Sequence, residues 1–375
     1  MSSTWGDKKA VVAIDIGTSY TGLAYSLSGD YHADKKTEKI YTVFRYSWSY
    51  SSLNKTPTVL LLNPDKSFMA FGYDAEKRFA ELAEDGIDES QYHYFKHFKM
   101  ELYSDQAGIS HDHLRIASEP ECAAAYMHTY QLPKLSGSSK ELFLMAEGDC
   151  YLILNMGNRT VDIAAHKINR QGKFEEIMHP HGGPWGGINV NLKFEQALVA
   201  VSGAATFERF RTEFSYDYLD FMRNFELKKL ASPSECSNVV NITIPRAYVD
   251  CHTEENGEDF STSLLGLAST AILAGSTFKK DKLKITNERF EMFFHDTFKH
   301  IIDNVGLLLE RLRQRYSVKT IFCVGGFSDC KLLAKKIKET FSDKTVIIPP
   351  EAVGAIMRGA IIYGRDEGII QSRIS

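Results

Sequence analysis

The sequence predicts an α/β protein built of two lobes, and three observations lead to that expectation. At 375 residues the chain is longer than one common domain of roughly 150 residues. Apolar runs typical of strands alternate with stretches of helical periodicity. Two hairpin-like segments, 11–27 and 151–168, share the order strand, polar residue, glycine, polar turn, strand. Such a repeat indicates a duplicated lobe with a ligand held between the copies.

The amino-acid composition indicates which kind of protein to expect and which partners to exclude. A hydrophobic content of 43%, a charged content of 25% and 10 prolines are typical of an ordered globular chain. The net charge of −4 provides no general basic field, so we expect neither nucleic acid nor an anionic membrane as a partner. The polar start and the lack of long apolar runs predict a cytoplasmic protein without a membrane span. The six cysteines show no metal-like spacing and are expected to be reduced, mostly buried thiols.

The first 140 residues begin with the 11–27 hairpin, where an apolar run meets a Gly-Thr-Ser turn and returns as a second strand. Residues 57–71 then predict two strands joined by a turn at 63–67, followed by a helix that opens near Tyr73 and Asp74. Glu119 and Pro120 suit the N-terminus of an alanine-rich helix. The polar stretch 133–141 marks the lobe junction.

The rest of the chain carries longer helical patterns. After the 151–168 hairpin we expect a helix at 190–201 and a helical stripe at 207–230 with one buried face: Phe207, Phe210, Phe214, Tyr218, Phe221 and Phe225. Residues 238–250 predict a strand with a loop, and 289–316 a long amphipathic helix whose apolar face is Phe290, Phe294, Phe298, Ile301, Val305, Leu308 and Leu312. A strand, a Gly-Gly turn and a helix follow at 320–341, and a last helix at 351–364. The expected domains are a first lobe at 1–140, a second lobe at 141–350, and a C-terminal helix and tail at 351–375 that return toward the first lobe.

The first hairpin has the residues of a phosphate-binding turn. Gly17 lets the backbone approach a phosphate, and Thr18, Ser19 and Tyr20 offer amide donors and hydroxyls in sequence. Asp15, at the end of the strand, suits a magnesium ion bound through its water shell. The alternative is an ordinary hairpin turn without a ligand.

Three further places support the phosphate interpretation. The second hairpin contains Gly157, Thr160 and Asp162. Gly325 and Gly326 form a strand-to-helix loop that can pass under a purine and a ribose, and Glu119 opens a helix. Together these segments predict a nucleotide site.

In these segments the chain resembles the 70-kDa heat-shock protein family of the actin-like ATPase superfamily, and within it the divergent 12A/12B branch. The stretches that carry the resemblance occur in family order and span most of the chain: 13–26, 71–79, 94–102, 118–126, 160–168, 182–191, 322–333 and 356–364. The resemblance implies an actin-like, ribonuclease-H-like fold of two lobes with an ATP/ADP and magnesium cleft between them.

The resemblance also implies roles for single residues. Asp15 and Asp162 would lie near magnesium, Glu119 near the attacking water, and Lys99 or Lys96 near the γ-phosphate. Gly325, Gly326 and Phe327 would lie at the adenosine. Gly186 would also contact the nucleotide, and Glu226 and Lys229 match the helix that touches the nucleoside.

The second hairpin departs from the family pattern Asp-x-Gly-Gly-Gly-Thr. Asn155 replaces the aspartate, and a lost charge pair at about 4 Å is worth roughly 4 kcal/mol at an effective dielectric near 20. Asn158 and Arg159 replace glycines at a turn where positive φ angles are expected. Arg159 either contacts a phosphate or points to solvent. At most a slow ATPase is therefore expected.

A second departure lies between Met100 and Leu114, where the family has a strand and a helix but this chain has only 13 residues. The first lobe is therefore expected to lack a strand beside its phosphate hairpin, as in a shortened isoform or a truncated gene model. The family's peptide-holding region is also expected to be missing. The histidine pairs at 111–113 and 179–181 are interpreted as solvated rather than metal-binding.

The resulting hypothesis is a cytoplasmic, chaperone-like nucleotide-binding protein of the stress-response type, in which ATP or ADP acts as a conformational switch with weak or no hydrolysis. Protein partners are possible. The alternatives are a nucleotide-independent interaction scaffold and, with no motif for a sugar pocket, a sugar kinase of the same superfamily.

Overall fold

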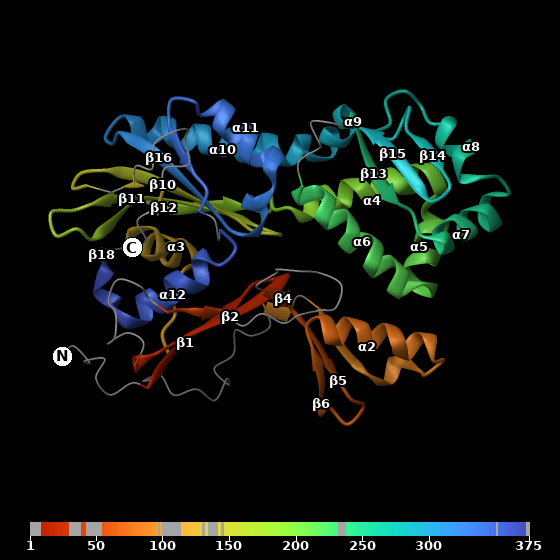
Figure 1. Cartoon of the computed structure of the whole chain (residues 1–375), viewed down its shortest axis with the longest axis horizontal. Coiled ribbons are helices and arrows are strands. Elements are labelled where there is room, and N and C mark those ends of the chain that lie inside the picture. Colours follow the sequence, from red (N-terminus) through yellow and green to blue (C-terminus); the bar gives the residue numbers. More distant parts are fainter. Residues whose placement is uncertain are drawn as a thin grey trace. The chain divides into compact units, whose positions relative to one another are not determined.

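A computed structural model gives the fold of the described residues, which are 9–29, 39–42, 55–96, 98–99, 114–129, 132–133, 142–143, 146–231, 238–349 and 352–372. They form a mixed α/β structure with several sheets (Figure 1). The chain divides into two compact units. Unit 1 is Met1–Pro184, Leu307–Ser328 and Phe341–Ser375, and unit 2 is Trp185–Gly306 and Asp329–Thr340.

The first sheet of unit 1 is built on the predicted hairpin. Strands β1 (Ala10–Ile16) and β2 (Tyr20–Leu27) pair antiparallel, and β3 (Tyr41–Thr42) and β4 (Lys55–Pro57) add to the other edge of β2. The Gly17 amide donates to the Tyr20 carbonyl at 3.0 Å and closes the turn. Among the described residues, β1 pairs with β2 alone.

The next elements also follow the prediction. Strands β5 (Val59–Leu62) and β6 (Phe68–Phe71) flank the 63–67 turn, helix α2 (Tyr73–Glu84) follows, and β7 (His93–Lys96) pairs with β5. A small core of apolar side chains holds them together: Val59, Leu61, Ala70 and Ala75.

The second sheet of unit 1 has six strands in the order β17-β16-β10-β11-β12-β18. Their bounds are β10 (Cys150–Met156), β11 (Val161–Ile168), β12 (Phe174–Gly183), β16 (Val318–Val324), β17 (Thr345–Ile347) and β18 (Ile370–Ser372). All seven residues of β10 are buried, as expected of a continuous apolar run between a parallel and an antiparallel neighbour. The second predicted hairpin is thus confirmed as β10 and β11.

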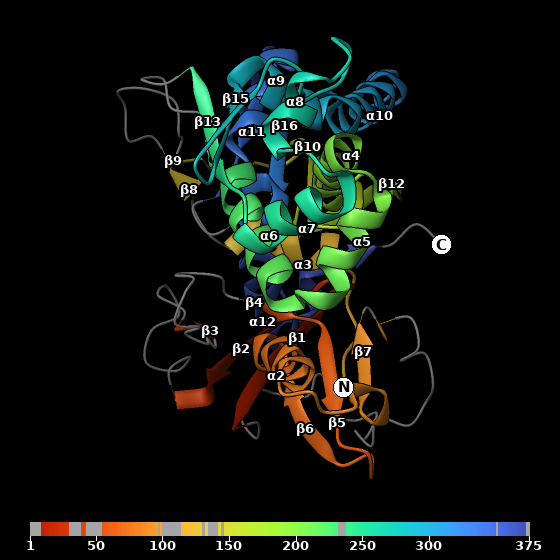
Figure 2. The ribbon, with the colours of Figure 1, turned by 90° about the vertical axis from the view of Figure 1, so that its right-hand side faces the viewer.

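Two helices rich in small residues pack side by side in unit 1 (Figures 1 and 2): α3 (Glu119–Thr129) and α12 (Ala355–Arg365). Helix α12 also packs against β1 and β2. At the crossing, a Cβ on Gly359 would lie 1.7 Å from the Cys122 carbonyl oxygen, so only glycine fits there. Burial raises the pKa of the Cys122 thiol to about 12.

Unit 2 is mainly helical, with one small sheet in the order β13-β15-β14. Its elements are α4 (Ile188–Ser202), α5 (Ala204–Glu213), α6 (Ser215–Leu230), β13 (Val239–Thr243), α7 (Arg246–Asn256), α8 (Phe260–Leu265), β14 (Thr277–Lys279), β15 (Lys282–Thr286), α9 (Asn287–Glu291), the first part of α10 (His295–Arg313) and α11 (Lys331–Thr340). Aromatic rings fill its core, and the rings of Phe194 and Phe225 stack 4.0 Å apart.

Three expectations about helices are corrected. The stripe at 207–230 is two helices that meet at Phe214, where φ is −121° and ψ is 50°, and Phe214 is 37% exposed rather than buried. Residues 246–250 are not a loop, because Pro245, with its fixed φ, precedes the first turn of α7. The long helix at 289–316 is interrupted by a 3-10 turn at 292–294, and Phe298 on its apolar face is only half-buried.

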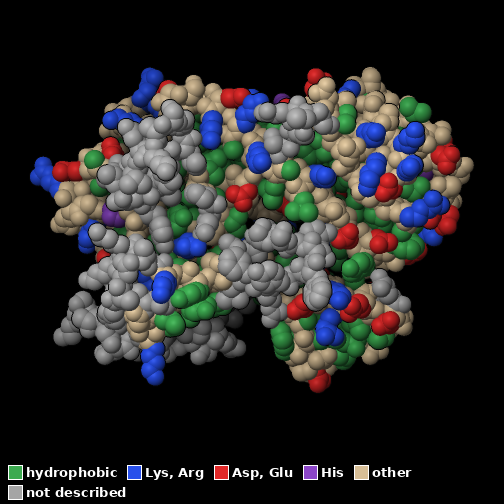
Figure 3. All heavy atoms as spheres, viewed as in Figure 1, with side chains coloured by type: hydrophobic (Ala, Val, Ile, Leu, Met, Phe, Trp, Pro, Cys, Tyr) green, Lys and Arg blue, Asp and Glu red, His purple; other side chains and the backbone are tan. Residues whose placement is uncertain are grey.

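The five cysteines within the described residues are free and buried, as expected, whereas Cys236 lies outside them. No helix among the described residues is long and apolar enough to cross a bilayer. On the face shown in Figure 3, acidic and basic side chains are interspersed rather than gathered by sign. The junction at 133–141 lies almost wholly outside the described residues, and the domain boundaries at 140 and 350 stay predictions.

Candidate functional site

The two hairpins of unit 1 present matching rows of residues across their sheets. In the first sheet, Asp15 of β1 pairs with Gly22 of β2, and Gly22 pairs with Lys55 of β4. In the second, Asn155 of β10 pairs with Asp162 of β11, which pairs with Gly182 of β12. Each row begins two residues before the turn glycine, so the sequence repeat is also a repeat of geometry.

Asp15 is buried and forms an ion pair within its own row. The Lys55 ammonium lies 2.6 Å from Asp15 Oδ2, and the two side chains are 16% and 7% exposed. Gly22, between them, has no side chain, and a Cβ there would lie 3.1 Å from Lys55 Cγ. The lysine therefore crosses β2 above Gly22. Sequence reasoning missed Lys55, which lies 40 residues from Asp15 along the chain.

The first turn is supported from outside by Thr58. Its amide donates to the Ser19 carbonyl at 2.9 Å and its hydroxyl to the Gly17 carbonyl at 2.7 Å. The Ser19 hydroxyl oxygen is buried and has no hydrogen-bond partner among the described residues. A buried hydroxyl without a partner costs free energy, and an anionic oxygen at the turn would satisfy it.

The second turn has the same closure, since the Gly157 amide donates to the Thr160 carbonyl at 2.9 Å. Asn158 and Arg159 do not have positive φ angles, so the expected need for glycine at these positions is wrong. The reason is that the turn bends without entering the left-handed region. Arg159 is exposed to solvent.

Glu119 begins helix α3, where a capping box fixes the helix start. The Ser118 amide and hydroxyl both donate to Glu121 Oε2, at 3.0 and 2.8 Å. The sequence signal for this cap is the motif Ser118-x-x-Glu121. It places Glu119 at the first helical position.

Both carboxylate oxygens of Glu119 have partners. Asn155 Nδ2 donates to Oε2 at 2.8 Å, and Lys99 Nζ lies 3.5 Å from Oε1. Glu119, Asn155 and Lys99 therefore meet at one point. Lys96, the alternative to Lys99, is exposed and lies over the Tyr94 ring at 5.1 Å.

Asp162 lies in the same electrostatic environment. Burial and the nearby negative charge of Glu119 raise the pKa of Asp162, while the Thr160 hydroxyl and Lys99 oppose the shift. The Thr160 hydroxyl lies 3.4 Å from Asp162 Oδ2. The second row thus contains a carboxylate whose charge is disfavoured beside the neutral Asn155.

The Gly-Gly loop follows β16 beside Asn155. Gly325 has φ of +88°, and a Cβ there would lie 2.5 Å from the Met156 carbonyl oxygen and 2.7 Å from Asn155 Oδ1. A Cβ on Gly326, by contrast, would meet no atom within 4 Å. Phe327 is buried. Gly325 is therefore needed by the fold, whereas space remains beside Gly326.

The other residues predicted to bind nucleotide, Gly186, Glu226 and Lys229, belong to unit 2. Lys229 is fully buried, and its ammonium contacts the Gly187 carbonyl at 3.0 Å, Asn191 Oδ1 at 2.9 Å and Glu226 Oε2 at 2.6 Å. Gly186 accepts a hydrogen bond from the Asn189 amide at 3.2 Å. Because the three contacts match the three donors of an ammonium, Lys229 ties α6 to the start of α4. Its contact with a nucleoside stays a prediction.

The donor set does not fit a tightly bound magnesium ion. Asp15 already has an ammonium partner, and Asn155 supplies an amide in place of a carboxylate. Among the described residues there is no group of three or more histidine, cysteine or acidic side chains that could hold a metal. Hard cations prefer several oxygen ligands or waters held by carboxylates, so the expected role of Asp15 toward magnesium is weakened.

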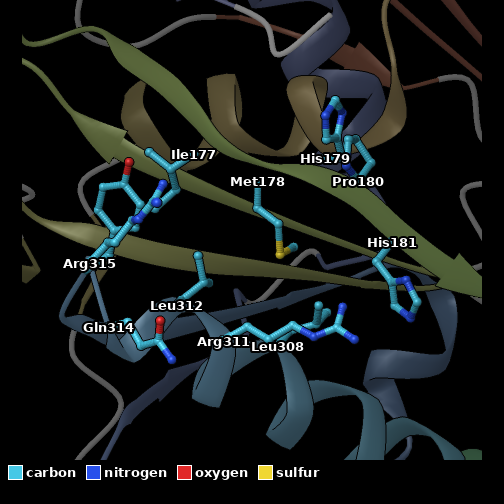
Figure 4. A pocket seen from close by; sticks show the side chains of 11 residues that line it. Ile177, Met178, His179, Pro180, His181, Leu308, Arg311, Leu312, Gln314 and Arg315 are labelled. Atoms are coloured by element: carbon cyan, nitrogen blue, oxygen red, sulfur yellow. The ribbon is translucent and has the colours of Figure 1, made fainter.

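A separate pocket of about 530 Å³ lies between β12 and the end of α10 (Figure 4). Its lining includes Arg311, Arg315, His179 and His181, with Met178 and Leu312 between strand and helix, but no carboxylate. It offers no acid–base pair, so the hairpin site remains the better candidate. The expectation that 179–181 is no metal site stays a prediction, and 111–113 lies outside the described residues.

Comparison with known proteins was made over the whole chain. The chain is 25% identical to heat shock 70 kDa protein 12A of Mus musculus and to that of Homo sapiens, over 97% of this chain and 70% of each relative. It is 23% identical to heat shock 70 kDa protein 12B of Homo sapiens, with the same coverage. No protein-family model matches the chain.

The alignment with 12A also shows where the chains differ in length. It has 488 positions, whereas 97% of 375 residues is about 364, so about 124 positions (488 − 364) hold a residue of the relative alone. Insertions of this total size lie within the matched region of the relative. The near-complete coverage, with the motifs in order, shows that this chain is a distant homologue of the heat shock 70 kDa proteins 12A and 12B, the divergent branch that its sequence resembles.

Proposed function

We propose that this chain is a divergent heat-shock-70-like protein of the actin-like ATPase fold that binds ATP or ADP and hydrolyses ATP slowly or not at all. Nucleotide acts as a conformational ligand that changes which protein partner binds. The homologues named heat shock 70 kDa protein 12A and 12B support the family, and the paired phosphate-type turns of unit 1 support the ligand.

The observation that supports weak hydrolysis is that both carboxylate oxygens of Glu119 already have partners within the chain. A carboxylate positions or deprotonates a water best when its lone pairs are not already directed at protein donors. Here Oε2 accepts from Asn155 and Oε1 faces Lys99. An aspartate at position 155 could not donate this hydrogen bond, so the substitution itself ties up the candidate base.

The first experiment is calorimetric titration of the purified chain with MgATP and MgADP, combined with thermal melts and a phosphate-release assay. We expect binding and a raised melting temperature, with little or no phosphate released. Absence of binding by a protein that melts cooperatively would contradict the proposal. Rapid phosphate release would contradict its second half.

The Ser19 hydroxyl offers a direct test of where phosphate binds. Ser19→Ala removes one hydrogen bond of about 1 kcal/mol, so nucleotide affinity should fall roughly fivefold. Ser26→Ala is a matched control, because its hydroxyl is also buried without a partner among the described residues but lies in β2. Equal effects of the two changes would place the phosphate elsewhere.

The second candidate is an interaction scaffold that binds no nucleotide. Asn155 and Lys55 both fill the site with contacts to residues of the same chain. These contacts favour a scaffold over an active ATPase. A scaffold should show neither heat nor a thermal shift with either nucleotide. Partner binding that is the same with and without ATP would support it.

A further inference from the structure

We propose that the ammonium of Lys55 takes the place of the magnesium ion, so that nucleotide binding by this chain does not need a divalent metal. The inference rests on the proposed function, because it concerns the same phosphate site. It assigns to Lys55 a role that neither the motif resemblance nor the site residues predicted from sequence included.

The geometry that supports this assignment is the row Asp15, Gly22, Lys55. Lys55 lies in register with Gly22, which lies in register with Asp15, so the lysine reaches the carboxylate by crossing one strand. The side chain of Met357 and the stem of Lys55 both occupy the space that a Cβ on Gly22 would take, so only glycine lets the lysine cross there. The resulting 2.6 Å ion pair is largely shielded from water, which favours a persistent contact.

The position of the pair relates it to phosphate binding. Asp15 lies two residues before Gly17, whose turn carries the unpartnered Ser19 hydroxyl. A metal ion bound to a nucleotide would approach the same carboxylate from the turn. The ammonium already neutralises that carboxylate and would repel a divalent cation. A cationic donor at this place can instead pair with phosphate oxygens, as lysines do in other phosphate sites.

The residues of the second row also make the site less attractive to a divalent cation. Asn155 removes one negative charge, and its side-chain amide is already bound to Glu119. Lys99 adds another cation beside Glu119. The residues around the two turns therefore attract a divalent cation weakly while retaining two ammonium groups for a polyanion.

The experiment is calorimetric titration of the whole chain with ADP, once in excess magnesium and once in EDTA. We expect the two dissociation constants to agree within about threefold. Loss of binding in EDTA, with binding retained in magnesium, would overturn the inference while leaving the proposed function intact. No binding under either condition would overturn both.

The variant Lys55→Met removes the ammonium and keeps the apolar stem. It should weaken ADP binding at least tenfold in EDTA and regain most of the affinity in magnesium, because Asp15 is then free to attract the ion. Equal losses in both buffers would overturn the inference, since Lys55 would then bind phosphate without replacing a metal. Lys77→Met is the control, because Lys77 pairs with Glu81 on the exposed face of α2 and should change neither value.

Lys55→Met leaves Asp15 buried without its partner and can lower stability. Lys55→Arg keeps the cation and is the second variant. It should fold and retain binding that is insensitive to EDTA. If a folded Lys55→Arg protein bound ADP in magnesium and lost that binding in EDTA, a cation at position 55 would not be what replaces the metal.

Discussion

The side-chain amide of Asn155 donates a hydrogen bond to Glu119 Oε2 at 2.8 Å, joining the end of β10 to the first residue of α3. The contact requires a donor at position 155, because two carboxylates at this distance would repel. Asn155 is therefore part of a formed structural contact rather than only a lost aspartate. The same contact joins two elements of the fold and underlies the proposal of weak hydrolysis.

Asn155→Asp should destabilise the protein in EDTA by roughly 1–3 kcal/mol, since it places like charges together at a partly solvated site. It should also make nucleotide binding respond to magnesium and raise phosphate release. Urea unfolding and a phosphate-release assay measure the two effects. Asn155→Ala is the control that removes the bond without adding charge, and unchanged stability of the aspartate variant would contradict the need for a donor at position 155.

Adding Asn158→Gly and Arg159→Gly to Asn155→Asp tests the original interpretation of the second turn. The two residues have ordinary φ angles, so glycine there relieves no strain and should loosen the free turn by about 0.5–1 kcal/mol each. The triple variant is still predicted to bind MgATP more tightly than wild type. Unchanged affinity by calorimetry would mean that the second hairpin does not contact phosphate.

Gly325 and Gly326 form a matched pair of adjacent positions. Gly325→Ala should lower the free energy of unfolding by more than about 2 kcal/mol, because the new Cβ meets backbone atoms at a positive φ. Gly326→Ala should fold normally and lower nucleotide affinity, since only a ligand would occupy the open space beside it. Thermal melts and titrations of both variants separate the effects, and full affinity of Gly326→Ala would remove this loop from the site.

His166 should make the protein acid-sensitive. Burial lowers its pKa to about 4, with Glu121 opposing the shift, whereas an unfolded histidine titrates near 6.5. Between these values only the unfolded chain binds the proton, so the free energy of unfolding falls as pH decreases, by about 1.4 kcal/mol per pH unit. Urea unfolding at pH 7 and pH 4.5 should show a loss of roughly 2–3 kcal/mol. Most of this loss should disappear in His166→Leu.

The neighbours of β1 among the described residues predict uneven protection. Among the described residues β1 has one neighbour, and Val12, Ile14 and Ile16 on one side of it are 56%, 55% and 37% exposed. Amides of residues 10–27 should therefore exchange with deuterium faster than those of 150–168, and limited proteolysis should leave a fragment that begins after about residue 141. Uniform protection of both hairpins would contradict a missing neighbour.

The sequence predicted those parts of the fold that depend on local patterns. Both hairpins, the start of α3 at Glu119 and most of the buried face of α10 follow from glycine position, the Glu119-Pro120 pair and periodicity. The kink at Phe214 could not be predicted, because aromatic spacing continues across it while the backbone does not. The Lys55–Asp15 pair was missed for a different reason. It depends on how β4 registers against β2, and residues 40 apart in sequence carry no local signal for that pairing.

The close crossing of α3 and α12 at Cys122 and Gly359 has a consequence for biosynthesis. The inner faces of β1 and β2 complete their core with a helix that the ribosome makes about 330 residues later, an interval of roughly 15–65 s at 5–20 residues per second. During that time the first hairpin and the alanine-rich helix emerge with their apolar faces uncovered. The nascent chain thus exposes the kind of apolar surface for which chaperones exist.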